Sequence, residues 1–186
     1  MEDESIGEKI ASANWEGNIV FLQEMANDGL FDPLSITKVE LWNYLHRANL
    51  VKPSPKETIS FYLSKGVPVN AQDCYGMTPL HYAVREHNYG AVKLLLEAGA
   101  DPCLKNQDGT DSLIQTLEKV PLEEDIPIIR MLISYGANPY LKNAHDSAFL
   151  DSINFAASRR SYLKELANEV AVKAPKNFKY KVLNFK

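Results

Sequence analysis

The chain has 186 residues, of which 45% are hydrophobic and 24% charged, as is ordinary for a single globular protein with a buried core. No apolar run approaches the roughly 18 residues of a membrane-spanning helix, so no membrane contact is expected. Residues 1–172 carry 15 basic and 24 acidic side chains, a balance of −9. Because phosphate binding needs clustered Lys and Arg, this balance argues against nucleic acid and favours a protein partner with a basic surface, although surplus acid also serves solubility alone.

Two features predict a cytoplasmic protein. Residues 1–5 are acidic, whereas a secretory signal begins with basic residues and continues with an apolar stretch. The two cysteines, Cys74 and Cys103, lie far apart in the sequence and show no metal-type spacing. We therefore expect them to be reduced thiols in the cytoplasm.

A glycine recurs at a regular distance along the chain and predicts a repeated structural unit. Gly29, Gly66, Gly99 and Gly136 are separated by 37, 33 and 37 residues. Each follows an apolar pattern of helical spacing, and glycine is the usual residue just past a helix end. The spacing therefore predicts successive pairs of helices, with four extra residues in two of the units.

The first two units depart from a regular repeat. Residues 6–30 are expected to form a partial unit that caps the N-terminal end of the array. Residues 38–70 form the second unit, with Leu45-His46-Arg47-Ala48 in its first helix. Lys52-Pro53-Ser54-Pro55 separates its two helices, because proline and the residue before it disfavour helical geometry.

The third unit, residues 73–105, has the clearest local signals. Gly76 closes a turn, Thr78 is a helix-capping residue, and Pro79 suits the first helical position, where no N–H is needed. The second helix is expected to stop at Gly99. The second unit has no Thr-Pro pair, so the start of its first helix stays undetermined at this point.

The fourth unit, residues 106–142, repeats the third with Asp111 and Ser112 in place of the Thr-Pro pair. Its loop between helices is lengthened around residues 121–125, whose acidic side chains are either solvated or in contact with a basic partner. Its end, residues 136–143, closely matches residues 99–106. This internal match is the strongest sign of true repetition.

The fifth unit, residues 143–172, is degraded and is expected to be a C-terminal cap. Asp146 takes the position of the turn glycine, and a second helix is predicted from about Ser161. The outer face of this helix carries charged residues, as the end of a stacked array requires. A basic tail, residues 173–186, follows.

The segment Thr78-Pro79-Leu80-His81-Tyr82-Ala83, within a 33-residue period, resembles the signature of the ankyrin-repeat family. The resemblance extends over residues 6–172. It implies an all-α fold with short β-hairpin loops, an α-solenoid of about five units including two degenerate caps, in a single domain over residues 1–172. It also implies that His81, and His46 at the equivalent place, hydrogen-bond a neighbouring turn.

No motif for chemistry is found in the sequence. It contains no Gly-x-Ser-x-Gly elbow, Gly-rich phosphate loop, His-Glu-x-x-His or Cys-x-x-Cys, and His87 and His145 belong to distant units. Asp111-Ser112 and Asp151-Ser152 are interpreted as helix-capping pairs. We therefore expect no catalytic residues, no cofactor and no metal.

The family resemblance implies that partners bind on a concave face lined by the loop tips and the exposed side of each first helix. Two interpretations stay open for some positions, since Trp15 can simply pack the first unit and Arg85 with Glu86 can be a solvated ion pair. Tyr75 and Met77 are expected on a solvent-facing tip, where binding explains them better than packing. The candidate partner-binding residues are Trp15, Glu16, Leu50, Tyr75, Met77, Arg85, Glu86, Asp108, Glu118 and His145.

The function expected from these features is non-catalytic protein binding. The most concrete version resembles bacterial immunity proteins of the ankyrin kind, inhibitors that cover a toxin in the cytoplasm. The alternatives are an adaptor or secreted effector that recruits a host or signalling protein and, from another class, an enzyme with its site in the long loops or tail. The chain is expected to be a monomer when free.

Overall fold

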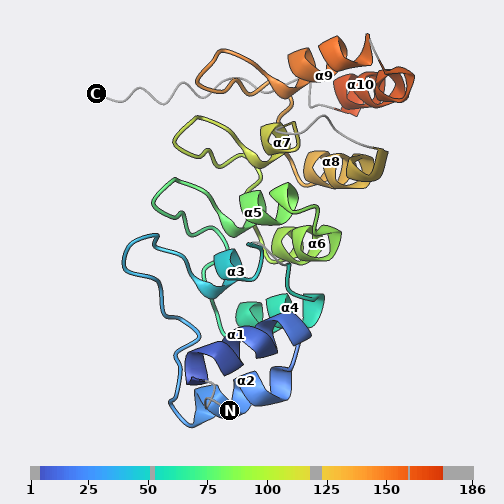
Figure 1. Ribbon diagram of the computed structural model, residues 1–186. Coiled ribbons are helices and arrows are strands. Elements are labelled where there is room, and N and C mark those ends of the chain that lie inside the picture. Colours follow the sequence, from blue (N-terminus) through green and yellow to red (C-terminus); the bar gives the residue numbers. More distant parts are fainter. Residues whose placement is uncertain (1–4, 51–52, 118–122, 159, 174–186) are drawn as a thin grey trace.

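A computed structural model describes residues 5–50, 53–117, 123–158 and 160–173 of the chain. The helices stack in successive pairs from the N-terminal to the C-terminal end, and the loops between pairs project on one side, the loop side (Figure 1). This arrangement confirms the expected all-α solenoid. The helices are α1 (Ile6–Glu16), α2 (Ile19–Asn27), α3 (Tyr44–Arg47), α4 (Lys56–Ser64), α5 (Pro79–Arg85), α6 (Tyr89–Glu97), α7 (Ser112–Gln115), the 3-10 helix η1 (Glu123–Asp125), α8 (Ile126–Ser134), α9 (Phe149–Ala157) and α10 (Ser161–Lys173).

The hydrophobic core runs along the whole stack, between two rows of helices. The second helices form one row, in which α2 contacts α4, α4 contacts α6, α6 contacts α8, and α8 contacts α10. In the other row α5 packs against both α3 and α7. Each helix pair places at least one large, fully buried side chain between the rows: Leu22, Leu45, Leu80, Leu113 and Ile153. Each helix pair therefore buries its apolar face against its neighbours, and no pair has a core of its own.

The signals at the helix starts act as predicted in the third pair. Thr78 is the N-cap of α5, its side chain accepts a hydrogen bond from the backbone N–H of His81, and Pro79 is the first helical residue. In the second pair, Asn43 supplies the start signal that the sequence left undetermined. Its side-chain oxygen accepts from the backbone N–H of His46 at 3.1 Å.

Two buried histidines tie neighbouring pairs together, as the family resemblance implied. The ring Nε2 of His46 bonds the carbonyl of Met77, and that of His81 bonds the carbonyl of Thr110, both at 3.1 Å. A carbonyl only accepts, so Nε2 carries the proton, and Nδ1 accepts from the backbone N–H of Asn43 or Thr78. Burial lowers the pKa of His81 to about 4, which keeps this ring neutral.

The loop side is built from turns that are joined to one another by backbone hydrogen bonds. These tips comprise residues 37–42, 73–77, 106–110 and 143–147. The N–H of Cys74 donates to Glu40, that of Gln107 to Tyr75, and that of Ala144 to Asp108, at 2.9, 2.9 and 3.2 Å. In the described part of the chain no strand forms, and only one isolated antiparallel bridge, Lys142 with Ala148, is present.

Glycines serve two different purposes in this stack. Gly99 ends α6 with a φ of 89°, as expected, and a Cβ there would meet nothing within 4 Å. Gly109, in the third of the four tips, has a φ of 71°, and a Cβ there would lie 2.7 Å from the backbone nitrogen of Ala144. Glycine at position 109 is therefore required both by its backbone angle and by the close approach of the next tip.

The C-terminal pair confirms one expectation and corrects another. Helix α10 begins at Ser161 and buries Leu163 and Leu166, as its spacing predicted. Asp151-Ser152 is not a capping pair, because both residues lie inside α9, whose N-cap is Ala148 without a side-chain bond. The basic tail lies outside the described residues apart from Lys173. None of the described helices has the length and apolar composition needed to span a membrane.

Candidate functional site

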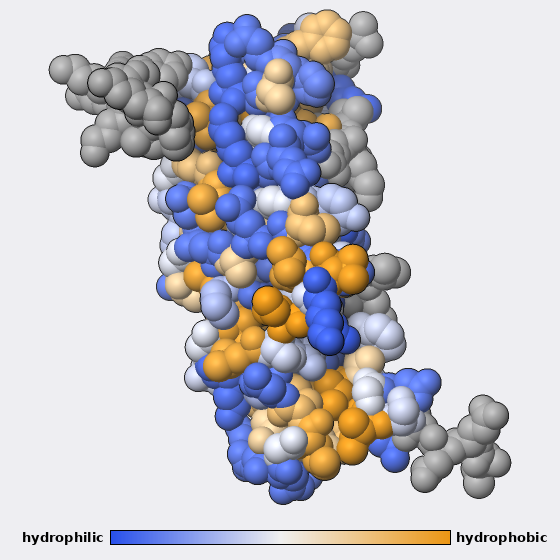
Figure 2. Space-filling view, turned by 90° about the vertical axis from the view of Figure 1, so that its left-hand side faces the viewer, coloured by the Kyte–Doolittle hydropathy of each residue, from blue (hydrophilic) through white to orange (hydrophobic). Residues whose placement is uncertain are grey.

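Apolar side chains gather on the N-terminal half of the loop side. Figure 2 shows this side, with hydrophobic residues on its lower half and mostly hydrophilic residues above. The loop between α2 and α3, residues 28–43 (the α2–α3 loop), contributes five exposed aliphatic residues: Leu30, Leu34, Ile36, Val39 and Leu41. Val39 is the most exposed of them at 77%. Part of this stretch lies between the first two units predicted from the sequence and received no role there, although aliphatic residues in a segment with turn residues were a readable signal.

Beside this loop, an aromatic and acidic cluster fixes the first and second tips against α5. The carboxylate of Asp73 accepts from the indole N–H of Trp42 at 2.9 Å and from the hydroxyl of Tyr82 at 2.6 Å. Burial works to raise the pKa of Asp73, but these bonds and two from backbone amides outweigh it, and the pKa lies below its ordinary value. Trp42, which the sequence analysis did not single out, is thus a positioning residue for this face.

The candidate residues differ in how far they reach solvent. Tyr75 is 57% exposed and Trp15 47%, and three others are also exposed: Glu16, Asp108 and His145. Leu50, Arg85 and Glu86 are half-buried. Glu118 lies outside the described residues.

Met77 is not on the solvent-facing surface where the sequence placed it. Only 7% of it is exposed. Its backbone N–H donates to Asp73 and its carbonyl bonds His46, so the turn directs the side chain inward. Its sulfur lies 3.5 Å from the side-chain nitrogen of Asn106, in the next tip. Met77 therefore packs between tips and is a structural residue.

Two of the predicted residues, Trp15 and Leu50, line one hollow between α1 and α3. The hollow has a volume of about 220 Å³, and Tyr44, Arg47 and Ser54 also line it. The guanidinium of Arg47 stacks on the ring of Tyr44, 4.9 Å from its centroid. These three residues were not among the predicted ones, because they line the same hollow as Trp15 only in the folded stack.

The other candidates do not converge with this hollow. Arg85 stacks on Tyr82, 4.6 Å from the ring centroid, and pairs with Glu86 at 3.1 Å. Tyr75, Asp108 and His145 occupy three successive tips. The predicted set therefore describes a long surface with an N-terminal hollow and no single compact site.

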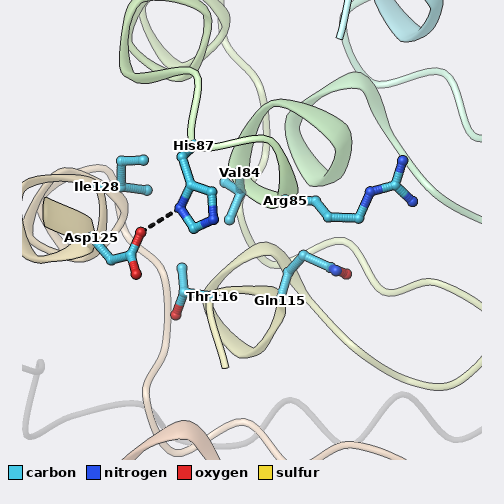
Figure 3. A pocket seen from close by; sticks show the side chains of 7 residues that line it. All are labelled: Val84, Arg85, His87, Gln115, Thr116, Asp125 and Ile128. Carbon is cyan, nitrogen blue, oxygen red and sulfur yellow. Dashed lines mark hydrogen bonds and ion pairs between the residues drawn. The ribbon is translucent and has the colours of Figure 1, made fainter. Parts of the chain in front are cut away.

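A second cavity lies between the third and fourth helix pairs. It has a volume of only about 20 Å³, room for about one water molecule. Figure 3 shows His87 pointing toward Asp125, to which it is hydrogen-bonded, with Arg85 directed away from the pair. His87 thus connects the turn between α5 and α6 with the start of α8. Its surroundings indicate a structural contact and leave no room for a substrate.

Metal binding and nucleophilic catalysis both depend on which side chains the described residues bring together. Within them, no group of three or more His, Cys, Asp or Glu side chains is arranged to hold a metal ion. Cys74 and Cys103 are free thiols, and burial raises the pKa of Cys103, which lowers its thiolate fraction. What the arrangement offers is an extended surface for contact with a macromolecule.

Comparison with known proteins identifies the repeats. Residues 36–106 match the family model described as ankyrin repeats (3 copies). An ankyrin repeat protein of Acanthamoeba polyphaga mimivirus is 32% identical over 99 residues, 53% of this chain and 23% of that protein. An ankyrin repeat-containing protein of Treponema pallidum is 31% identical over 94 residues, 50% of this chain and 30% of that protein.

A third relative is the transient receptor potential cation channel subfamily A member 1 homolog of Caenorhabditis elegans. It is 55% identical over 51 residues, 27% of this chain and 4% of the channel. The match to this chain spans less than one third of the length of each of the three relatives. The repeats, the histidine bridges between them and these matches together show that the chain contains ankyrin repeats over residues 36–106.

Proposed function

We propose that this chain is a non-catalytic module that binds a partner protein through the loop side of its stack. Ankyrin repeats are generally protein–protein interaction modules. The observation that carries the proposal is the apolar surface of the α2–α3 loop, which adjoins Tyr75 because the N–H of Cys74 donates to Glu40. Exposed apolar side chains that gather in one place mark interaction sites, because covering them removes apolar area from water.

The charge of the chain supports a partner with a basic surface. Residues 1–172 have a balance of −9, and exposed carboxylates stand on the tips at Asp108 and Asp146. Complementary charge increases the rate of association and disfavours wrong partners more than it adds to affinity. We therefore expect the association rate to fall as the salt concentration rises.

We propose further that binding inhibits the partner, as in an immunity-type protein. The tips are held by backbone hydrogen bonds, so a partner meets a preformed surface and little reorganisation opposes binding. A rigid surface of this kind blocks access to whatever it covers. Addition of the chain to its captured partner should abolish the partner's activity at equimolar amounts. Full activity of the saturated complex would instead identify an adaptor.

The binding face is tested by affinity capture with two matched valines. Val39→Asp places a charge in the α2–α3 loop, and Val172→Asp does so on α10, at positions 77% and 75% exposed. We expect Val39→Asp to lose the captured partner and Val172→Asp to retain it, with both variants folded by circular dichroism. Retention by Val39→Asp, or equal loss by both, would show that the loop side is not the binding face.

A further inference from the structure

The hollow between α1 and α3 has the construction of a binding pocket. Its volume of about 220 Å³ is below the roughly 300–1,000 Å³ of pockets for drug-sized ligands, so it fits a group the size of one or two side chains. The indole of Trp15 and the side chain of Leu50 supply apolar walls, and Tyr44 with Arg47 supplies an aromatic and cationic wall. In Figure 1 this region lies where α1 meets the second helix pair.

The cationic wall is held in place by a chain of contacts through the core. The ring of Tyr44 stacks on that of Tyr62 with centroids 4.7 Å apart and an interplanar angle of 8°. The hydroxyl of Tyr62 donates to the side-chain oxygen of Asn14, on α1, at 2.7 Å. Arg47 stacks on the outer face of this assembly. Its guanidinium is therefore oriented before any partner arrives, which lowers the entropic cost of binding.

Two polar groups at this hollow have unused hydrogen-bonding capacity. Ser54 is 3% exposed, and its hydroxyl has no hydrogen-bond partner among the described residues, although its backbone N–H and carbonyl are both bonded. Among the described residues, no carboxylate lies within 4.0 Å of the Arg47 guanidinium. A buried hydroxyl without a partner is destabilising, and a stacked arginine presents its in-plane N–H groups to a carboxylate. Both groups therefore suit an occupant that brings oxygen acceptors.

We propose that this hollow binds an apolar side chain and the Asp or Glu beside it in the sequence of a partner protein. The apolar side chain covers Trp15 and Leu50, and the carboxylate reaches Arg47. The buried hydroxyl of Ser54 bonds the carboxylate after a rotation of the Ser54 side chain. The excess of acidic residues elsewhere on this chain favours a partner with a basic surface. The pocket therefore selects a partner in which one acidic residue lies within that basic surface. The inference rests on the proposed function and names one contact within it.

The test is an NMR titration of the isotope-labelled full chain, following the indole N–H of Trp15. The probes are N-acetylated, C-amidated tetrapeptides, Gly-Leu-Glu-Gly, Gly-Leu-Gln-Gly and Gly-Ala-Glu-Gly, and inorganic phosphate. We expect the Leu-Glu peptide to bind about tenfold more tightly than either of the other two peptides, because one charge-assisted contact or one buried aliphatic side chain is lost. The Arg47→Gln variant should bind the Glu and Gln peptides equally, and Ser54→Ala should reduce the preference to about threefold.

Arg85→Gln is the matched control, since Arg85 also stacks on a tyrosine but is already paired with Glu86. It should leave the preference unchanged. The proposal is overturned if the Glu and Gln peptides bind the natural chain equally, if Arg47→Gln keeps the preference, or if phosphate produces the same Arg47-dependent shifts as the Leu-Glu peptide. If the peptide titration fails but Val39→Asp still loses the captured partner, the proposed pocket is wrong and the proposed function stands. If the titration fails and Val39→Asp retains the partner, both proposals are wrong.

Discussion

The third and fourth helix pairs have the same plan and differ in how well their polar groups are satisfied. In the third pair, Thr78 and His81 bond each other, His81 also bonds the neighbouring turn, and Tyr82 bonds Asp73. In the described part of the fourth pair, four atoms of three buried residues have no hydrogen-bond partner: Oδ2 of Asp111, Oγ of Ser112 and both amide atoms of Gln115. The match to the family model also ends at residue 106, where the fourth pair begins.

The comparison shows what the repeat signature contributes physically. Its Thr and His are polar residues whose bonds are complete inside the stack, whereas Asp111 and Gln115 are polar residues buried with bonds unmade. Each unmade bond costs about 1–3 kcal/mol. Helix α7 has only four residues against seven in α5. We therefore expect the fourth pair to be the less stable of the two, and the following changes test this.

The largest effect is expected at the tip glycines. Gly109→Ala should lower the free energy of unfolding by about 3 kcal/mol or more, because it combines an unfavourable φ with a Cβ 2.7 Å from a backbone atom of the next tip. Gly76→Ala, where the nearest atom is at 3.0 Å, should cost less, and Gly99→Ala, in open space, about 1 kcal/mol. Urea denaturation measures the order, and equal costs at all three positions would contradict it.

Acidification should affect the two pairs in opposite directions. Burial lowers the pKa of His81 to about 4, so its contribution to stability is present above the ordinary pKa of 6.5 and is lost as pH falls toward 4. Burial raises the pKa of Asp111 to about 6, against two backbone hydrogen bonds that lower it. Its contribution is therefore present below its ordinary pKa of 3.8 and is lost as pH rises toward 6.

Asp111→Asn isolates the second contribution and keeps a residue that caps helices well. The folded pKa of about 6 against 3.8 corresponds to about 3 kcal/mol. On going from pH 6 to pH 4, the variant should lose up to this much more stability than the natural chain. Thermal unfolding monitored at several pH values gives the comparison, and parallel profiles for the two proteins would rule out a buried, proton-holding Asp111.

A substitution at Gln115 tests directly how much the unsatisfied hydrogen-bonding groups cost in stability. Gln115→Leu should raise the free energy of unfolding by about 1–2 kcal/mol, because it removes a buried amide and keeps the volume. The equivalent change in the third pair, Tyr82→Leu, should instead destabilise, since it leaves Asp73 without one of its donors. If both changes destabilise equally, the amide of Gln115 stabilises the fold and is not an unsatisfied, destabilising group.

The smallest effects are expected from surface ion pairs. Arg130 on α8 pairs with Glu169 on α10 at 2.8 Å, and Lys93 pairs with Glu97 within α6 at 3.9 Å. Arg130→Gln should cost about 0.5 kcal/mol and Lys93→Gln less, with both costs reduced in 1 M salt. A cost above about 2 kcal/mol for either would mean that the pair is far less solvated than its exposure indicates.

The repeated helix pairs could be predicted from sequence because their signals are local. Gly99 and Pro79 fix helix ends through their own backbone preferences, and His81 was placed by its position in a family signature. The start of α3 was missed, since Asn43 caps as well as Thr78 does but belongs to no such signature. Met77 was placed outward because its inward packing depends on the neighbouring tip, which the local pattern does not describe.

The surface was harder to predict than the stack. Trp15 and Leu50 could be assigned to one side of the array from their places in the repeat. Arg47 and Ser54 could not, because the role proposed for them depends on what they lack among the described residues: a carboxylate for one and a hydrogen-bond partner for the other. Such absences appear only once all neighbours have been placed.

The backbone bonds between tips have a consequence for how the loop surface can change during evolution. They use main-chain atoms, so the side chains of Glu40, Cys74, Tyr75, Asp108 and Ala144 are exchangeable without loss of the spacing between tips. Gln107 differs, because its side chain also donates to the carbonyl of Cys74 at 2.8 Å. New specificities can therefore be acquired one tip at a time, and the energetic effects of such exchanges on recognition should be close to additive.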